Sequence, residues 1–159
     1  MENKEIIQQF YEAFAAGNAE KMVAHYHDTI VFHDPAFGTL KGEQAKSMWK
    51  MLLSRKDTGL DITFDVISAD DTSGKANWEA TYLYGPKKRK VINRVSAEFI
   101  FKEGKIIRHT DHFNLWRWTQ QALGFPGYFL GWSSFMKAKI QKQTNMMLRA
   151  FMEGNEVEQ

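Results

Sequence analysis

The chain of 159 residues is 43% hydrophobic and 14% aromatic, and its 21 Lys and Arg nearly balance its 19 Asp and Glu. This length predicts a single domain, residues 1–159, with a substantial core, and the balanced charge gives no reason to expect a nucleic-acid partner. No cysteine is present, which excludes disulfides, thiolate metal sites and cysteine nucleophiles. The polar N-terminus and the lack of any apolar run near the roughly 20 residues that cross a membrane predict a cytoplasmic protein with no membrane partner.

Two helices are predicted at the start of the chain. Apolar residues recur at helical spacing from Ile6 to Phe14, which predicts the first helix. Gly17 is suited to end that helix, and Asn18 is a good N-cap for the second. The second helix is expected to bury Met22, Val23 and Tyr26.

An aspartate in an apolar turn is the most informative local feature. A short extended segment, residues 30–33, leads to Asp34, and Pro35 restricts Asp34 to non-helical geometry. Phe32 and Phe37 flank the turn, so desolvation would raise the pKa of Asp34 and suit it to carry protons. The alternative is structural: the Asp34 carboxylate caps backbone N–H groups in an Asx-type turn.

A third helix is predicted after Gly42, and the pattern then changes to strands. The helix places five apolar residues on one face: Ala45, Met48, Trp49, Leu52 and Leu53. Alternating apolar and polar residues then predict four strands, at residues 60–66, 75–84, 91–101 and 106–118. Because short turns connect them, we expect a strongly curved antiparallel sheet.

The last part of the chain, residues 119–159, is predicted to be a C-terminal helical extension. Residues 127–132 (GYFLGW), in an aromatic linker broken by glycines, are expected to be a lid over a cavity or an edge of a dimer interface. A helix from Ser134 to about Met152 follows, with five residues on its buried side: Phe135, Ile140, Met147, Leu148 and Phe151. These elements together predict an α+β domain with helices packed on one face of the sheet.

Three segments together resemble the nuclear transport factor 2-like superfamily, which includes ketosteroid isomerase, SnoaL-type polyketide cyclases and limonene epoxide hydrolase. They are residues 10–18 (FYEAFAAGN), 32–38 (FHDPAFG) and 104–113 (GKIIRHTDHF), within a similarity that covers about residues 5–118. The resemblance implies a cone-shaped fold, in which a curved antiparallel sheet wraps around the N-terminal helices and leaves an apolar cavity at the open end. Because this fold hosts enzymes, binding modules and transport factors, function has to be transferred residue by residue.

The likeness to ketosteroid isomerase gives Asp34 the position of the general base. That enzyme also uses a tyrosine and a second aspartate as oxyanion donors. The position of the tyrosine falls on Phe10, beside Tyr11, and the position of the aspartate falls near Ala97, beside Glu98. Since both donors are replaced, steroid isomerisation is not the expected reaction.

The likeness to limonene epoxide hydrolase gives Asp111 the position of the acid, within residues 109–114 (HTDHFN). The arginine that partners this acid has no equivalent at residues 77–79 (NWE), which keep only the carboxylate of Glu79. Epoxide hydrolysis is therefore a minor expectation. SnoaL-type cyclases vary more in their polar residues, so they provide the broadest analogy.

The candidate catalytic residues are Asp34, Glu79, His109 and Asp111. Strand alternation places His109, Asp111 and Phe113 on one face. Two neighbouring carboxylates would separate their pKa values and leave one protonated at neutral pH. Such a pair suits proton transfer next to a carbonyl, as in isomerisation, or intramolecular aldol closure.

Structural alternatives remain for two of these carboxylates. Asp111 can instead pair with Arg108, Arg94 or a histidine, and Glu79 can form an exposed cross-strand ion pair. We expect no metal site, because His25 and His27 diverge at helical spacing and because His109 and His112 point to opposite faces of a strand.

The side chains expected to contact a small apolar ligand are mostly aromatic: Phe10, Tyr11, Phe14, Tyr26, Phe32, Phe37, Trp49, Ala97, Phe99 and Phe113. No cofactor is expected. Three functions stay open: a cofactor-independent isomerase, cyclase or lyase, a non-catalytic binding module, and a dimerising scaffold. The exposed face of the sheet predicts a homodimer.

Overall fold

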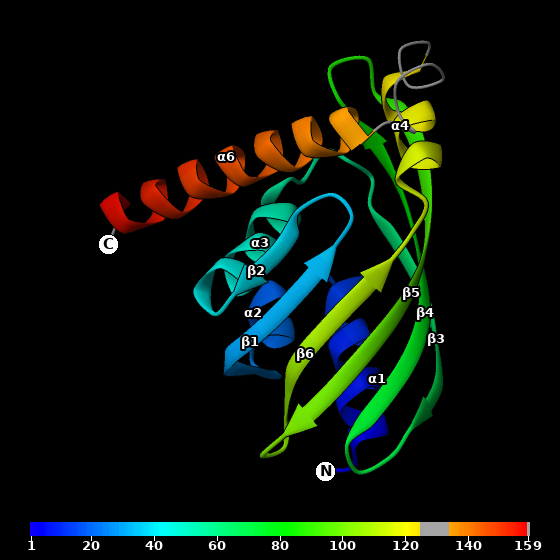
Figure 1. Ribbon diagram of the computed structural model, residues 1–159, viewed down its shortest axis with the longest axis vertical. Coiled ribbons are helices and arrows are strands. Elements are labelled where there is room, and N and C mark those ends of the chain that lie inside the picture. Colours follow the sequence, from blue (N-terminus) through cyan, green and yellow to red (C-terminus); the bar gives the residue numbers. More distant parts are fainter. Residues whose placement is uncertain (125–133, 159) are drawn as a thin grey trace.

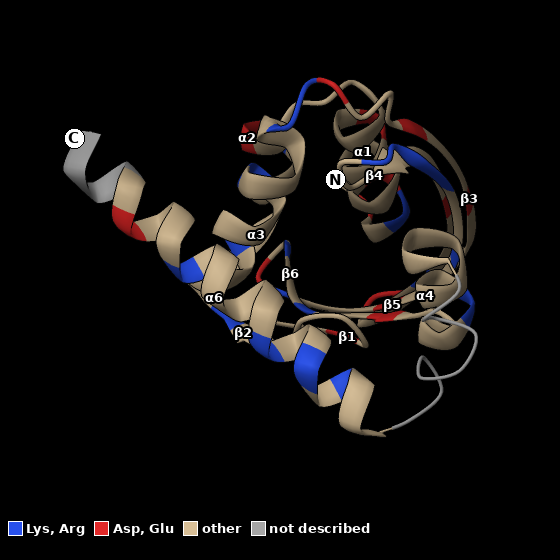
Figure 2. Ribbon diagram, turned by 90° about the horizontal axis from the view of Figure 1, so that it is seen from above, with Lys and Arg blue, Asp and Glu red and all other residues tan. Residues whose placement is uncertain are grey.

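A curved six-stranded sheet surrounds the first helix (Figure 1). The computed structural model describes residues 1–124 and 134–158. In chain order the elements are α1 (Asn3–Ala15), α2 (Ala19–Val23), β1 (Tyr26–Asp34), β2 (Gly38–Lys41), α3 (Glu43–Ser54), β3 (Asp61–Ala69), β4 (Ser73–Tyr84), β5 (Arg89–Lys102), β6 (Lys105–His112), α4 (Leu115–Leu123) and α6 (Ser134–Glu158). The predicted α+β cone is confirmed, with α1 lying inside the curve of the sheet (Figure 2).

The four predicted strands are antiparallel to one another as expected, but two further strands join the sheet and make it mixed, so the prediction of a wholly antiparallel sheet is wrong. Its strand order is β2-β1-β6-β5-β4-β3, and β1 runs parallel to β6, with Phe32 opposite His109. All other neighbouring strands are antiparallel. The predicted extended segment at residues 30–33 is therefore the end of a nine-residue strand that belongs to the sheet.

Tight turns fix the register of the antiparallel strands. Glu103 and Gly104 both have positive φ, 56° and 74°, and join β5 to β6 with Lys102 opposite Lys105. Glycine adopts this left-handed conformation without steric cost, which is why the turn predicted there forms.

Two predicted boundaries are corrected by local hydrogen bonds. Tyr26 belongs to β1, because α2 ends at Val23. The last strand ends at His112 and not at Trp118, because the Asn114 side chain accepts a hydrogen bond from Arg117 N (3.0 Å) and so caps α4. Asn18 caps α2 as predicted, through Lys21 N (3.0 Å).

Helix α6 packs across the end of the fold next to α3 (Figure 1). Leu148 joins the main core, and Ile140 joins a smaller cluster with Leu115 and Met136. The predicted burial of Phe135 and Met147 is wrong, because they are 72% and 45% exposed. Residues 125–133, which include the whole of the expected lid, lie outside the described residues. Among the described helices, none is both long and apolar enough to cross a membrane.

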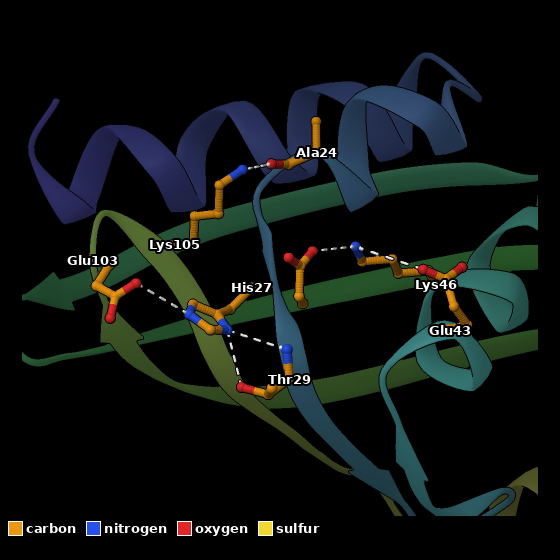
Figure 3. Close-up of polar contacts among 8 residues, drawn as sticks. Ala24, His27, Thr29, Glu43, Lys46, Glu103 and Lys105 are labelled. Atoms are coloured by element: carbon orange, nitrogen blue, oxygen red, sulfur yellow. Dashed lines mark hydrogen bonds and ion pairs between the residues drawn. The ribbon is translucent and has the colours of Figure 1, made fainter.

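Polar contacts tie the start of β1 to its neighbours away from the core (Figure 3). The Nδ1 atom of His27 accepts a hydrogen bond from Thr29 N (3.1 Å), and its Nε2 atom lies 3.4 Å from Glu103 Oε2. Lys105 Nζ donates to Ala24 O (2.8 Å). Both ring nitrogens of His27 are thus engaged in contacts within the chain.

Candidate active site

The Asp34 turn connects β1 to β2 and is closed by the aspartate itself. Asp34 Oδ1 accepts hydrogen bonds from Ala36 N (2.9 Å) and Phe37 N (2.6 Å). Pro35 keeps Asp34 extended, and Gly38, with φ 74°, lets the chain reverse so that it pairs with Asp34 across the hairpin. The Asx-type turn is therefore present. Among the described residues, Oδ2 of Asp34 has no hydrogen-bond partner.

Burial changes the acidity of Asp34. The residue is 8% exposed, and desolvation raises its pKa from 3.8 to about 7. The N–H bonds from Phe37 and Ala36 oppose this shift, while the negative charge of Asp111 adds to it. The turn and the proton-carrier hypothesis are thus compatible, because one oxygen holds the turn while the carboxyl group as a whole titrates near neutral pH.

The raised pKa of Asp34 predicts a pH-dependent stability. Between about pH 4 and pH 7 the folded state holds a proton that the unfolded state has released, so the stabilisation from this proton is lost as the pH rises to 7. We expect Asp34→Asn, which cannot ionise, to gain stability relative to the parent protein on going from pH 5 to pH 8. Urea unfolding of both proteins at several pH values measures this. A constant difference between them would contradict the burial of a titrating Asp34.

Asp111 is the end of a buried chain of hydrogen bonds. Its Oδ1 atom lies 2.8 Å from His109 Nε2, and His109 Nδ1 lies 2.7 Å from the hydroxyl of Tyr26. That hydroxyl accepts a hydrogen bond from Trp49 Nε1 (2.8 Å), and Trp78 Nε1 also reaches Asp111 Oδ1 at 3.4 Å. His109 and Asp111 are 0% and 2% exposed. Of the pairings considered for Asp111, the structure contains the one with a histidine.

The donor and acceptor roles in these hydrogen bonds determine which atoms of Tyr26 and His109 carry a proton. Trp49 Nε1 can only donate, so the Tyr26 oxygen accepts from it and the Tyr26 hydrogen points to His109 Nδ1. His109 then carries its proton on Nε2 and donates it to Asp111, which accepts as a carboxylate. Burial raises the pKa of Tyr26 well above 10, which keeps its hydroxyl protonated. The network fixes the position of the Asp111 carboxyl group.

A cavity of about 330 Å³ opens beside both aspartates. This volume is in the range of small-molecule sites. Six of the residues predicted from the sequence line it: Phe14, Asp34, Phe37, Trp49, Asp111 and Phe113. Apolar side chains from other elements complete the wall, among them Met48, Leu60, Tyr82 and Met147.

Other predicted residues lie outside the cavity wall. Five aromatic residues and one alanine are packed in the core: Phe10, Tyr11, Tyr26, Phe32, Phe99 and Ala97. His109 stacks between Phe99 and Trp49 and reaches the cavity only through Asp111. Glu79 forms a 3.0 Å ion pair with Arg94 and is not among the lining residues, so the structure does not bring it to the other carboxylates. The exposed ion pair considered for Glu79 is confirmed.

Tyr11 has a buried hydroxyl without a hydrogen-bond partner among the described residues. Burial raises its pKa well above 10, and the charge of Asp111 adds to the effect, so the two groups are close enough to interact. A buried polar group of this kind needs an explanation, such as a bound molecule or water. The described histidines and carboxylates form no group of three that could hold a metal ion.

The architecture is the cone-shaped fold that the sequence resemblance implied, and a solved NTF2-like structure shares this fold. The chain belongs to the SnoaL-like domain family, whose pattern matches residues 7–109. A comparison with curated proteins found no match.

Solved structures with the same fold include several kinds of enzyme. A provisionally named polyketide cyclase from Pseudomonas putida is 21% identical with a TM-score of 0.63, covering 77% of this chain and 98% of its own. An LEH-like epoxide hydrolase from M. tuberculosis is 18% identical with a TM-score of 0.58, covering 80% and 89%. A provisionally named isomerase from Bacillus subtilis is 14% identical with a TM-score of 0.60, covering 76% and 91%. At these identities the likeness shows the fold alone.

Proposed function

We propose that this protein catalyses acid/base chemistry of the isomerase or cyclase type on a small, mostly apolar carbonyl compound. The observation that carries the proposal is Asp34, a buried carboxyl group with a pKa of about 7 on the wall of an apolar cavity. A group that titrates near the working pH can both accept and return a proton efficiently. Asp111, fixed by His109 on the same wall, is the charged partner that helps to keep this pKa high.

The proposed reaction begins with ionised Asp34. Its free Oδ2 takes a proton from the carbon next to the carbonyl, and the electron pair of the broken C–H bond moves to the carbonyl oxygen as an enolate. In an isomerisation, protonated Asp34 returns the proton to a different carbon. In a cyclisation, the enolate carbon attacks a second carbonyl of the same molecule, and the new alkoxide takes the proton.

The mouth of the cavity indicates how a ligand would be oriented. Three exposed lining residues there are charged, namely Arg55, Asp57 and Lys88. The apolar part of the ligand would occupy the aromatic interior near Asp34, and a polar substituent would face these side chains.

Epoxide hydrolysis is disfavoured by the side chain that faces Asp111 from β4. This residue is Trp78, whose indole N–H reaches Asp111 Oδ1 at 3.4 Å. An indole is neutral and donates one hydrogen bond, so it cannot replace the arginine expected for that reaction.

Deuterium exchange tests the proposal without knowledge of the final product. The protein in D₂O at pH 7 is incubated with a panel of apolar ketones and diketones, and exchange at the carbon next to the carbonyl is followed by proton NMR. We expect exchange faster than in buffer for the compounds that bind. A second outcome is that some compounds raise the melting temperature, and so bind, while none in the panel exchanges deuterium. That result would favour the alternative function, a non-catalytic binding module.

We also propose a homodimer that forms through the outer face of the sheet. On β5 this face exposes Ile92 and Ile100, at 36% and 45%. Light scattering at micromolar concentration is expected to give twice the mass of the chain, and a monomer would remove the proposal.

A further inference from the structure

Helix α6 binds the carbonyl side of the Asp34 turn. Three of its side chains donate hydrogen bonds to three consecutive backbone oxygens, and all of these contacts are partly buried. They are Gln141 Nε2 to Pro35 O (3.0 Å), Thr144 Oγ1 to Ala36 O (2.8 Å) and Asn145 Nδ2 to Phe37 O (2.8 Å). Figure 1 shows α6 crossing the end of β1, where this turn lies.

The spacing of the three donors explains how one helix reaches one turn. Positions 141, 144 and 145 are three and four residues apart, so they lie on one face of α6. Leu148 continues this face into the main core, while Ile140 anchors the helix in the smaller cluster. The Lys and Arg side chains of α6 are exposed, and Figure 2 marks the positions of these residues along the helix in blue. The donors are therefore held toward the turn by packing on either side of them.

The turn is thus held from two directions. Asp34 Oδ1 accepts from the N–H groups of Ala36 and Phe37, and α6 donates to the carbonyls of the same two residues and of Pro35. Backbone groups that are partnered on both sides cannot rotate toward solvent without breaking several hydrogen bonds. α6 also supplies part of the cavity wall through Thr144 and Met147.

From these contacts we infer that α6 is a positioning element of the site, in which Gln141, Thr144 and Asn145 hold the Asp34 turn closed and Thr144 and Met147 limit the size of the ligand. This inference rests on the proposed function, since it gives the turn a role in proton transfer. The helix lies outside the segment that matches the SnoaL-like family, residues 7–109. The positioning is therefore a property of this chain beyond the matched domain.

The pKa of Asp34 reports whether the turn is closed to water. Its pKa is raised mainly by burial, so water that enters a loosened turn should lower it. Among the described residues, the titratable groups that interact electrostatically with Asp34 are Asp111, Tyr26 and Tyr82, and none of these three lies on α6. Neutral substitutions on α6 therefore act on Asp34 through solvent access and not through lost charge.

The test uses the double variant Thr144→Val with Asn145→Leu, which keeps the side-chain sizes and removes two donors. The titration of Asp34 is followed by the carbon-13 NMR signal of its carboxyl group, without any ligand. We expect the midpoint to fall by about one pH unit. Gln141→Ala is the milder variant if the double variant does not fold, and Gln143→Ala, on the exposed side, is the matched control with no expected shift.

An unchanged midpoint in a folded variant, even one with lowered thermal stability, would overturn the inference and leave α6 a merely structural helix. Because the titration needs no ligand, its result is independent of the deuterium-exchange assay. If the midpoint falls but the parent protein exchanges no ketone, the positioning stands and the proposed reaction fails. If the parent exchanges ketones and the midpoint is unchanged, the reaction stands and the positioning fails.

Discussion

Replacing Asp34 with asparagine is expected to slow ketone deuterium exchange by a factor of about 10²–10⁴, the usual contribution of a general base. The amide oxygen of asparagine can still accept the N–H bonds of Ala36 and Phe37, so the turn should remain closed. The amide cannot take a proton from carbon at neutral pH. Rates are measured by proton NMR at pH 7 with a ketone that the parent protein exchanges.

The matched control for this variant is Asp65→Asn, on the exposed side of β3. It removes the same charge from the chain at a distance from the cavity, and its exchange rate should equal that of the parent. Ligand affinity should change little in Asp34→Asn, as measured by the thermal shift with the same ketone. Full exchange activity in Asp34→Asn would show that another group accepts the proton.

The second large effect is expected from His109→Leu, which should lower the free energy of unfolding by about 2–5 kcal/mol, because two buried polar groups each lose a hydrogen-bond partner. The imidazole bonds the Tyr26 hydroxyl on one side and Asp111 on the other, and it is 0% exposed. Leucine fills similar space but leaves the Tyr26 proton without an acceptor and Asp111 with only the 3.4 Å contact from Trp78. Urea unfolding at pH 7 measures the loss.

His112→Leu is the control, because it replaces a histidine on the opposite face of the same strand. The His112 side chain is 58% exposed and lies 3.7 Å from Glu98. Surface changes of this kind usually alter stability by no more than about 0.5 kcal/mol. Equal stability losses in the two variants would show that the hydrogen bonds of His109 contribute little.

The predictions that were confirmed rest on short-range patterns. Helices α1 and α3 and the hairpins of β3 to β6 follow from apolar periodicity and from turn residues, which act over a few positions. The Asp34 turn was predictable because Asp34 and Pro35 are adjacent and dictate its geometry. Placing Asp111 and His109 on the buried face needed only strand alternation.

The corrected and missed features depend on contacts between distant residues. Tyr26 and His109 are 83 positions apart, and no local pattern pairs a tyrosine expected in a helix with a histidine in the last strand. The hydrogen bonds from Thr144 and Asn145 to the turn each span 108 positions. The likeness to limonene epoxide hydrolase predicted Glu79 in the site, but alternation along β4 places its side chain on the outer face, where it pairs with Arg94.

The parallel pairing of β1 with β6 has a consequence for the order of folding. Phe32 pairs with His109 across a long stretch of chain, and the entropy of closing so long a loop slows such pairings relative to the hairpins between them. Asp34 and its strand β1 are made early in synthesis, yet β6, which pairs with β1, and α6, which donates to the carbonyls of the turn, are made late. We therefore expect the two halves of the cavity to join in a late folding step, so that backbone amides of β1 gain protection from hydrogen exchange after those of β4 and β5.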